Sequence, residues 1–222
     1  MTSRTPIILS AARTPIGKFG GAFSQTPATV LGGHAIRAAV ARAGIDPAQI
    51  DEVIMGQVIQ AGSGQAPARQ AAILGGAPPS VAAFTINKVC GSSLKGVMTA
   101  ASFIRAGEGR LYVAGGMENM NMGPYLLDNA RFGYRLGHAQ MRDATVFDGL
   151  IDPFHDHHMG LSAEWLAATH GISREAQDAY ALESHRRAAA ATAAGHFQAE
   201  ITPVPLAGKQ AGGVIAADEA IR

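Results

Sequence analysis

Cys90 is the residue whose type and setting in this sequence point most directly to covalent chemistry. It lies between an apolar run at 83–87, which predicts a strand, and an apolar 3.6-residue period beginning at Ser92, which predicts a helix. The N-terminus of a helix carries unsatisfied N–H groups and a positive dipole end, which favour a thiolate over a thiol and can hold an oxyanion. Gly91 leaves the sulfur open to an incoming thioester. This setting suits covalent acyl transfer.

The same spacing has a second interpretation. Most free cysteines are small, buried and apolar, and one junction of strand, cysteine and helix does not by itself separate that role from the role of a nucleophile. Because Cys90 is the single cysteine, no disulfide can form within the chain, and a cytoplasmic location is expected.

Two other polar segments only partly match known sites. The segment 152–158 holds three histidines and two aspartates, but the consecutive His157 and His158 point in different directions and no second ligand cluster occurs elsewhere. No metal site is therefore expected. The loop 62–65 lacks the Gly-Lys-Ser/Thr ending of a phosphate-binding loop.

Alternating strands and helices over residues 1–118 are expected to position Cys90. Strands are predicted from continuous apolar runs at 7–11, 53–59, 83–87 and 111–116. Helices are predicted from helical spacing at 31–43, 66–74 and 92–106. Continuous apolar strands that alternate with helices indicate parallel pairing with helices on the sheet faces, so the expected fold class is α/β.

Residues 119–222 are expected to form a second, mostly helical part. The region 117–158 is rich in Met, Asn, Gly and Asp and has weak periodicity, which predicts a long irregular excursion. Two helices are then expected, at 161–170 and 174–194. The segments 201–205 and 214–215 are expected to be edge strands at most, since proline cannot donate a hydrogen bond to a sheet.

The composition of the 222 residues excludes several classes of protein. Hydrophobic residues make up 47% and charged residues 16% of the chain, which is too apolar for intrinsic disorder. Eighteen Lys and Arg against 17 Asp and Glu give a net charge of +1, so neither nucleic acid nor an anionic membrane surface is expected as a partner. No run approaches the ~18 apolar residues of a membrane span.

Five segments, spread from end to end, carry a family resemblance. They read ARTPIG at 12–17, NKVCGSSLK at 87–95, VAGGMENM at 113–120, HMGLSAE at 158–164 and ADEAIR at 217–222. Together they resemble the thiolases, which are acetyl-CoA acetyltransferases and their 3-ketoacyl-CoA relatives. The resemblance implies the N-terminal α/β domain of the thiolase fold, a parallel-rich mixed sheet with helices on its faces. A mostly helical loop subdomain follows, and the C-terminal half of the fold is absent.

The resemblance also implies roles for individual residues. Cys90 is the nucleophile that becomes acylated. His158, Met159 and Leu150 line the pantetheine arm of coenzyme A, and Arg222 lies near the adenine nucleotide, where a guanidinium can stack on the base and pair with phosphate. The implied substrates are acetyl-CoA and other acyl-CoA thioesters, and no cofactor is implied.

Two segments are implied to take part in assembly. Residues 57–69 correspond to a dimer contact beside the active site, and residues 122–143 correspond to the tetramerisation loop. A homodimer or homotetramer is therefore expected. The competing explanation for 122–143 is a flap that covers its own subunit.

The implied reaction joins two acetyl-CoA molecules into acetoacetyl-CoA, or runs the reverse thiolysis, through an acyl-Cys90 thioester. Thiolases also use a histidine in a Gly-His-Pro motif and a second cysteine in a Cys-x-Gly motif, and this sequence contains neither. The 222 residues are therefore expected to be the N-terminal part and to be inactive, or nearly so, alone. The missing half would follow in the same chain or form a separate one.

Two alternatives remain open at this stage. One is a condensing enzyme of the β-ketoacyl synthase type, against which Val89-Cys90-Gly91 and the Gly-Gly-Met-Glu loop at 115–118 favour a thiolase. The other is a non-catalytic fragment that binds acyl-CoA or assembles with another subunit.

Overall fold

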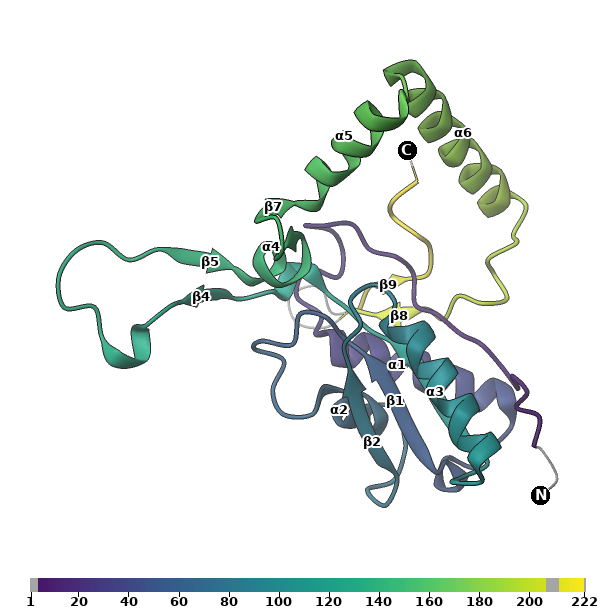
Figure 1. Ribbon diagram of the computed structural model, residues 1–222. Helices are drawn as coiled ribbons and strands as arrows, with labels where there is room; N and C mark the ends of the chain where they lie inside the picture. Colours follow the sequence, from purple (N-terminus) through teal and green to yellow (C-terminus); the bar gives the residue numbers. More distant parts are fainter. Residues whose placement is uncertain (1–3, 207–211, 222) are drawn as a thin grey trace. The chain divides into compact units, whose positions relative to one another are not determined.

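The computed structural model describes residues 4–206 and 212–221, which divide into two compact units (Figure 1). The first unit holds the residues up to Gly123 together with the segment Glu200–Glu219. The second holds Pro124–Ala199 and the residues after Glu219. The second unit is thus inserted into the first. The sequence predicts a boundary at residue 118, with all of 119–222 in the second part. The structure differs for the segment Glu200–Glu219, which belongs to the first unit.

Three parallel strands form the centre of the first unit. They are β1 (Glu52–Gly56), β2 (Ala82–Ile86) and β3 (Tyr112–Gly116), in the order β2-β1-β3. Each crossover contains a helix, α2 (Pro67–Leu74) or α3 (Ser92–Ala106), as parallel pairing requires. The expected α/β fold with a parallel sheet is confirmed.

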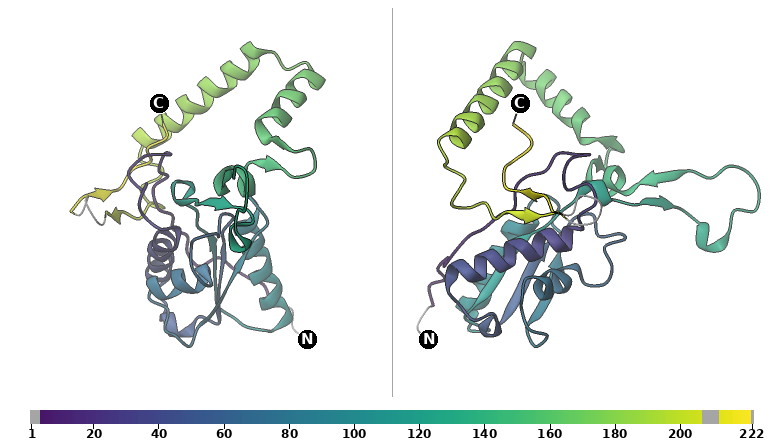
Figure 2. Two further views of the ribbon diagram at one scale, coloured as in Figure 1. Left: turned by 90° about the vertical axis from the view of Figure 1, so that its left-hand side faces the viewer. Right: turned by 180° about the vertical axis from the view of Figure 1, so that it is seen from behind.

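Helices cover both faces of this sheet. Val53 and Met55 on β1 pack into the core that contains α2 and α1 (Ala28–Ala43), whereas Ile54 faces Gly96 of α3. The left-hand view of Figure 2 shows the sheet between α1 and α2 on one side and α3 on the other. Since successive strand residues point to opposite faces, burial on both sides explains why β1 is apolar from Val53 to Met55.

The segment 7–11 does not form the buried strand that its apolar run predicts. Ile7 is 73% exposed and Ile8 is 81% exposed, and among the described residues no strand pairs with them. Just after this segment, an isolated parallel β-bridge joins Arg13 to Ile201. An apolar run becomes a strand only where a neighbour accepts and donates its backbone hydrogen bonds, so hydrophobicity alone gave the wrong structure here.

The segment 200–219 adds a small antiparallel pair to the first unit, β8 (Val204–Pro205) with β9 (Val214–Ile215). Val204 is fully buried and packs against Phe23 and Leu31 in a second, smaller core cluster. Short 3-10 turns at Pro47–Gln49 and Met120–Met122 complete the unit.

The second unit consists of short hairpins and three helices. Strands β4 (Tyr125–Leu127) and β5 (Met141–Asp143) pair antiparallel, as do β6 (Ile151–Asp152) and β7 (His157–His158). The remaining elements are a 3-10 turn at Ala130–Phe132 and the helices α4 (Ala144–Gly149), α5 (Met159–His170) and α6 (Arg174–Ala193). The two long helices lie within two residues of their predicted bounds. Over the described parts of the chain, no helix combines the length and apolar character needed to cross a membrane.

Candidate active site

Cys90 lies on the tight turn that joins β2 to α3, and it is exposed. The preceding residue, Val89, has a φ of +48°, a left-handed conformation that is costly for a β-branched side chain. Ser92 holds this turn, because its hydroxyl accepts a hydrogen bond from the Lys88 N–H (2.8 Å) and donates one to the Val89 carbonyl (2.6 Å). The Asn87 side chain accepts from the Val89 N–H (2.9 Å). The turn therefore presents the thiol in a fixed, strained conformation.

The N-terminus of α3 lies directly after the cysteine. Gly91 precedes the helix and provides no side-chain cap. The positive end of a 15-residue helix is therefore open to a negative charge next to Cys90. Both a thiolate and the oxyanion formed when it attacks a thioester are charges of that kind.

Two glycines, to which the sequence analysis gave no packing role, let α3 begin at this place. Gly56 ends β1 and lies opposite Gly116, which ends β3. A Cβ on Gly56 would lie 2.5 Å from the Ser92 Cβ, and one on Gly116 would lie 2.9 Å from the Ser93 Cβ. The glycines therefore permit the first turn of α3 to rest on the carboxyl edge of the sheet. The signal in the sequence that could have identified them is a glycine at the end of both β1 and β3.

Polar side chains fix the loops along the same edge. The Glu118 carboxylate accepts a hydrogen bond from the Val58 N–H (2.7 Å). The Asn119 amide donates to the carbonyls of Phe23 and Thr26 (2.7 Å each). The loops after β1 and β3 are thereby tied to each other and to the segment before α1. Both residues lie in the matched segment 113–120, but nothing in their spacing indicates these partners.

Gln57 is buried beside this edge and is 2% exposed. Its amide nitrogen donates to the Ile59 carbonyl (2.9 Å) and to the Ser63 hydroxyl (2.8 Å). A cavity of about 210 Å³ lies here and is lined by Gln57, Ser63 and Asn119, among others. Gln57 thus orders the loop after β1 within its own unit.

The second unit brings together three of the residues predicted to contact coenzyme A. Leu150 follows α4, and its carbonyl accepts a hydrogen bond from the Met159 N–H (2.8 Å). His158 pairs with Ile151 in the β6-β7 hairpin, and its Nδ1 accepts from the Gly160 N–H (3.0 Å) at the start of α5. His158 and Met159 are exposed. The fourth predicted residue, Arg222, lies outside the described residues.

The neighbouring histidines have hydrogen-bonding partners of their own. His155 Nδ1 lies 2.8 Å from Asp152, and this contact is the main cause that lowers the pKa of the Asp152 carboxyl. His157 Nε2 is hydrogen-bonded to the Ser162 hydroxyl (2.8 Å), and the rings of His155 and His157 stack. Within 4–206 and 212–221, no three His, Cys, Asp or Glu side chains gather as a metal site would require.

Comparison with known proteins decides the family. The model of the thiolase N-terminal domain matches residues 6–222, which is nearly the whole chain. The chain belongs to the thiolase family. This match favours the thiolase interpretation over a β-ketoacyl synthase.

Named thiolase relatives agree with this assignment. An acetyl-CoA acetyltransferase of Cupriavidus necator is 54% identical over 198 residues, which cover 89% of this chain and 50% of that protein. A protein of Staphylococcus aureus strain COL, named "Probable acetyl-CoA acyltransferase", is 49% identical over 220 residues, which cover 98% of this chain and 56% of that protein. The thiolase chain spans about half the length of these relatives.

The predicted thiolase residues are divided between the two units. Cys90 lies in the first, and Leu150, His158 and Met159 lie in the second. The roles of these residues remain predictions.

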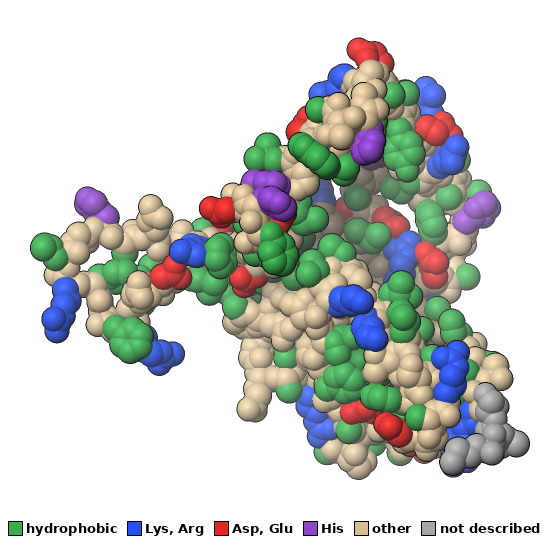
Figure 3. Space-filling model, in the orientation of Figure 1, with side chains coloured by type: hydrophobic (Ala, Val, Ile, Leu, Met, Phe, Trp, Pro, Cys, Tyr) green, Lys and Arg blue, Asp and Glu red, His purple; other side chains and the backbone are tan. Residues whose placement is uncertain are grey.

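The loop between β4 and β5 is rich in exposed apolar and basic side chains. Leu136 is 99% exposed and Phe132 is 84% exposed, and Tyr134 lies between them. Arg142 forms an ion pair with Asp128 (2.8 Å) at the base of the loop. Apolar and basic groups alternate along this loop, at the left of Figure 3. This segment lies within 122–143, for which a role in assembly is predicted.

Proposed function

We propose that this thiolase chain supplies the nucleophile of an acyl-CoA acyltransferase. The supporting observation is the exposed Cys90 on a strained turn at the open N-terminus of α3. The names of the relatives, acetyl-CoA acetyltransferase and acyltransferase, support acyl-CoA thioesters as substrates.

In the proposed first half-reaction the Cys90 thiolate attacks the carbonyl carbon of acetyl-CoA. A new carbon–sulfur bond forms, the bond to the CoA sulfur breaks, and CoA leaves as a thiolate that takes up a proton. In this proposal the positive end of α3 stabilises the oxyanion as it develops. In the second half-reaction the acyl group passes to the α-carbon of another acetyl-CoA and gives acetoacetyl-CoA, or returns to CoA in the reverse thiolysis.

Proton transfer in that second half-reaction requires groups that these 222 residues do not contain. The sequence has one cysteine and no Gly-His-Pro motif. A missing acid or base typically costs ~10²–10⁴-fold in rate. We therefore propose that these residues act together with the remaining half of a thiolase, and that alone they accept an acyl group without turning over at an ordinary rate.

The proposed substrate contacts are Leu150, His158 and Met159 for the pantetheine arm and Arg222 for the nucleotide. The proposed reaction needs no cofactor. A homo-oligomer is proposed from the exposed apolar loop between β4 and β5, since such loops usually cover a partner surface. A cytoplasmic location remains a prediction from the single cysteine.

Mass spectrometry after incubation with acetyl-CoA tests the proposal. We expect one acetyl group on Cys90 and none on the Cys90→Ser variant. A folded protein that takes up no acetyl group would contradict the proposed nucleophile and would favour the non-catalytic alternative. Acetoacetyl-CoA thiolysis at ordinary enzyme rates by these 222 residues alone would contradict the proposed need for the other half.

A further inference from the structure

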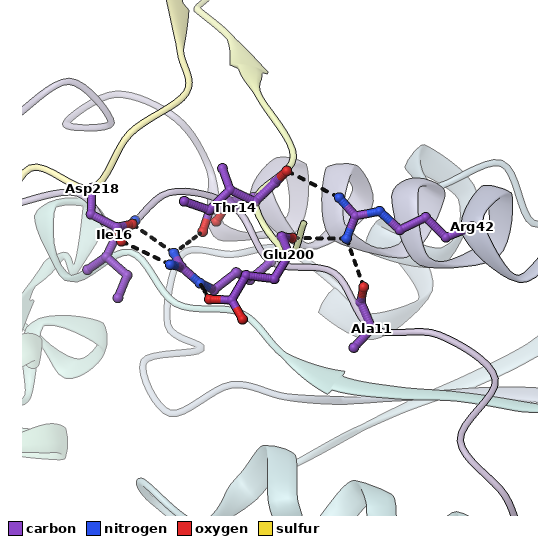
Figure 4. A network of polar contacts seen from close by, with 8 residues as sticks. Ala11, Thr14, Ile16, Arg42, Glu200 and Asp218 are labelled. Carbon is purple, nitrogen blue, oxygen red and sulfur yellow. Dashed lines mark hydrogen bonds and ion pairs between the residues drawn. The ribbon is translucent and has the colours of Figure 1, made fainter. Parts of the chain in front are cut away.

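Polar networks at two places in the first unit hold loops to one another, and the first is centred on Arg13. Its Nε donates to the Glu200 carboxylate (2.6 Å), and its terminal nitrogens donate to the two carboxylate oxygens of Asp218 (2.7 and 2.9 Å). Figure 4 shows Glu200 and Asp218 on either side of this guanidinium, with Arg42 donating to the Glu200 carbonyl (3.0 Å). These partners lie outside the turn that carries Cys90.

The second network closes on Val89, the residue directly before Cys90. The Val89 N–H donates to the side-chain oxygen of Asn87 (2.9 Å). The Val89 carbonyl accepts hydrogen bonds from the Ser92 hydroxyl (2.6 Å) and from the Ser92 N–H (3.1 Å). Asn87 and Ser92 therefore hold the peptide groups on either side of the Val89 Cα, and we call these contacts the Val89 clamp.

The Val89 clamp acts on a conformation that valine does not favour. The φ of +48° lies in the left-handed region, where the Cβ of an L-residue crowds the following carbonyl oxygen. The Val89 side chain is 48% exposed, so packing holds this conformation less firmly than it would hold a buried side chain. Strained conformations persist only where their surroundings fix them, and here the groups that are fixed are hydrogen-bonded backbone atoms.

The position of the thiol depends on this conformation, because Cys90 is the next residue. The Gly91 N–H donates to the Lys88 carbonyl (3.1 Å), so the backbone turns back on itself around Val89 and Cys90 before α3 begins. If the φ of Val89 changed to an ordinary negative value, the chain after Val89 would take another direction. Cys90 would then leave its place at the start of α3.

We propose that Asn87 and Ser92 are positioning residues for the Cys90 nucleophile and act through the φ of Val89. The inference adds residues to the reaction already proposed and rests on that proposed function. Neither side chain touches a substrate atom or takes up a proton in this proposal. Asn87 gives the cleaner test, because it is exposed and its replacement leaves the core intact, whereas Ser92 is 4% exposed.

The test measures the rate of Cys90 acetylation by acetyl-CoA, followed by mass spectrometry on the intact protein that contains these residues. Asn87→Ala removes the acceptor for the Val89 N–H. We expect acetylation to slow by about tenfold, since a misplacement of about an ångström can slow a reaction ~10²-fold. Asn87→Ser should slow it less, because a serine hydroxyl makes the same contact to the backbone two residues on, but more weakly than asparagine.

Rescue at position 89 separates positioning from general stability. Asparagine adopts the left-handed region more readily than valine, so it needs less help from the clamp. The double variant that combines Asn87→Ala with Val89→Asn should therefore be acetylated several times faster than Asn87→Ala alone. Val89→Asn by itself should change the rate little, so the effects of the two substitutions are not additive.

Arg13→Gln is the matched control, because it breaks the other polar network of the same unit. The Asp218 side chain is 10% exposed and also accepts the Ile16 N–H (2.8 Å), so loss of the guanidinium leaves a partly buried carboxylate without its cation. We expect a lower midpoint of urea unfolding and an unchanged rate of acetylation in the absence of urea. Equal slowing in Arg13→Gln and Asn87→Ala would show that the rate follows stability, and would overturn the inference.

Two further results would overturn it: a wild-type rate in Asn87→Ala, or a double variant no faster than Asn87→Ala. If Asn87→Ala does not fold, Asn87→Ser and its combination with Val89→Asn carry the same test.

A folded wild type that takes up no acetyl group would contradict the proposed function instead. Alkylation of Cys90 by iodoacetamide then tests the clamp, since it needs no acyl-CoA. We expect slower alkylation in Asn87→Ala, because the sulfur leaves the helix end that favours negative charge, and we expect Val89→Asn to restore the rate. Equal rates in all variants, or no restoration, would overturn the inference.

Discussion

Gly56 gives the sharpest test of how the active-site turn is built. In Gly56→Ala the new Cβ would lie 2.5 Å from the Ser92 Cβ and 3.0 Å from backbone atoms of Ser92 and Ser93. Carbon atoms in contact normally lie ~3.5–4.0 Å apart. Because backbone atoms cannot rotate away, the start of α3 must move by about an ångström. Overpacking of this kind typically costs ~1–3 kcal/mol.

We expect this movement to reach Cys90, which lies two residues before Ser92. A misplacement of about an ångström can slow a reaction ~10²-fold, so the rate of Cys90 acetylation should fall by about tenfold or more. The assays are urea unfolding followed by circular dichroism, and acetylation by acetyl-CoA followed by mass spectrometry. Both use the intact protein.

Gly115→Ala is the matched control. Gly115 lies on β3 directly before Gly116, the residue that pairs with Gly56. There the new Cβ would lie 3.5 Å from the Met55 sulfur, at ordinary contact distance. We expect near-normal stability and acetylation. If Gly56→Ala behaves like Gly115→Ala, the close approach of sheet and helix does not position the nucleophile, and the reasoning is refuted.

Three other changes have defined outcomes. Val89→Asn should raise the free energy of unfolding by up to ~1 kcal/mol in urea titration, because asparagine tolerates the left-handed region better than valine; a loss of stability would show that φ is not the source of strain. The hydrogen bond from Arg13 lowers the pKa of the Asp218 carboxyl in the folded protein. The ion pair therefore stabilises the fold fully at pH values above the pKa of an unfolded aspartate, ~3.9, and this stabilisation is lost as the pH falls through the lower pKa of the folded state. The stability difference between wild type and Asp218→Asn should therefore shrink below about pH 4, and a constant difference would contradict this. Leu136→Glu should reduce the mass measured by light scattering if the loop between β4 and β5 lies in an interface, and an unchanged oligomer would remove that assignment.

Local patterns in the sequence were sufficient for most of the secondary structure. The helices α5 and α6 have clear start and stop signals, including Ser173, whose side chain caps α6, and Gly171, which ends α5 in a left-handed conformation. The setting of Cys90 was also predictable, because a strand, a short turn and a helix follow one another without interruption. Such features depend on residues close in sequence.

Features that depend on distant partners were not predictable in the same way. The run at Ile7 and Ile8 has the composition of a strand but lacks a paired neighbour among the described residues. The return of 200–219 to the first unit depends on contacts between Arg13 and residues 187 and 205 positions later. The same holds for Gly56, whose importance follows from the approach of a helix that begins 36 positions further on.

The insertion of one unit into the other also sets an order for folding during synthesis. The sheet and its three helices are complete once residue 116 has been made, but Arg13 gains Asp218 only after about a hundred further residues have been made. Contacts so distant in sequence form late, because the intervening loop must first be closed. The loop 13–22 therefore lacks its contacts with Asp218 while residues 124–199 of the second unit are being synthesised. Slowing translation beyond residue 123 would prolong the lifetime of a half-finished first unit with its polar groups unpaired.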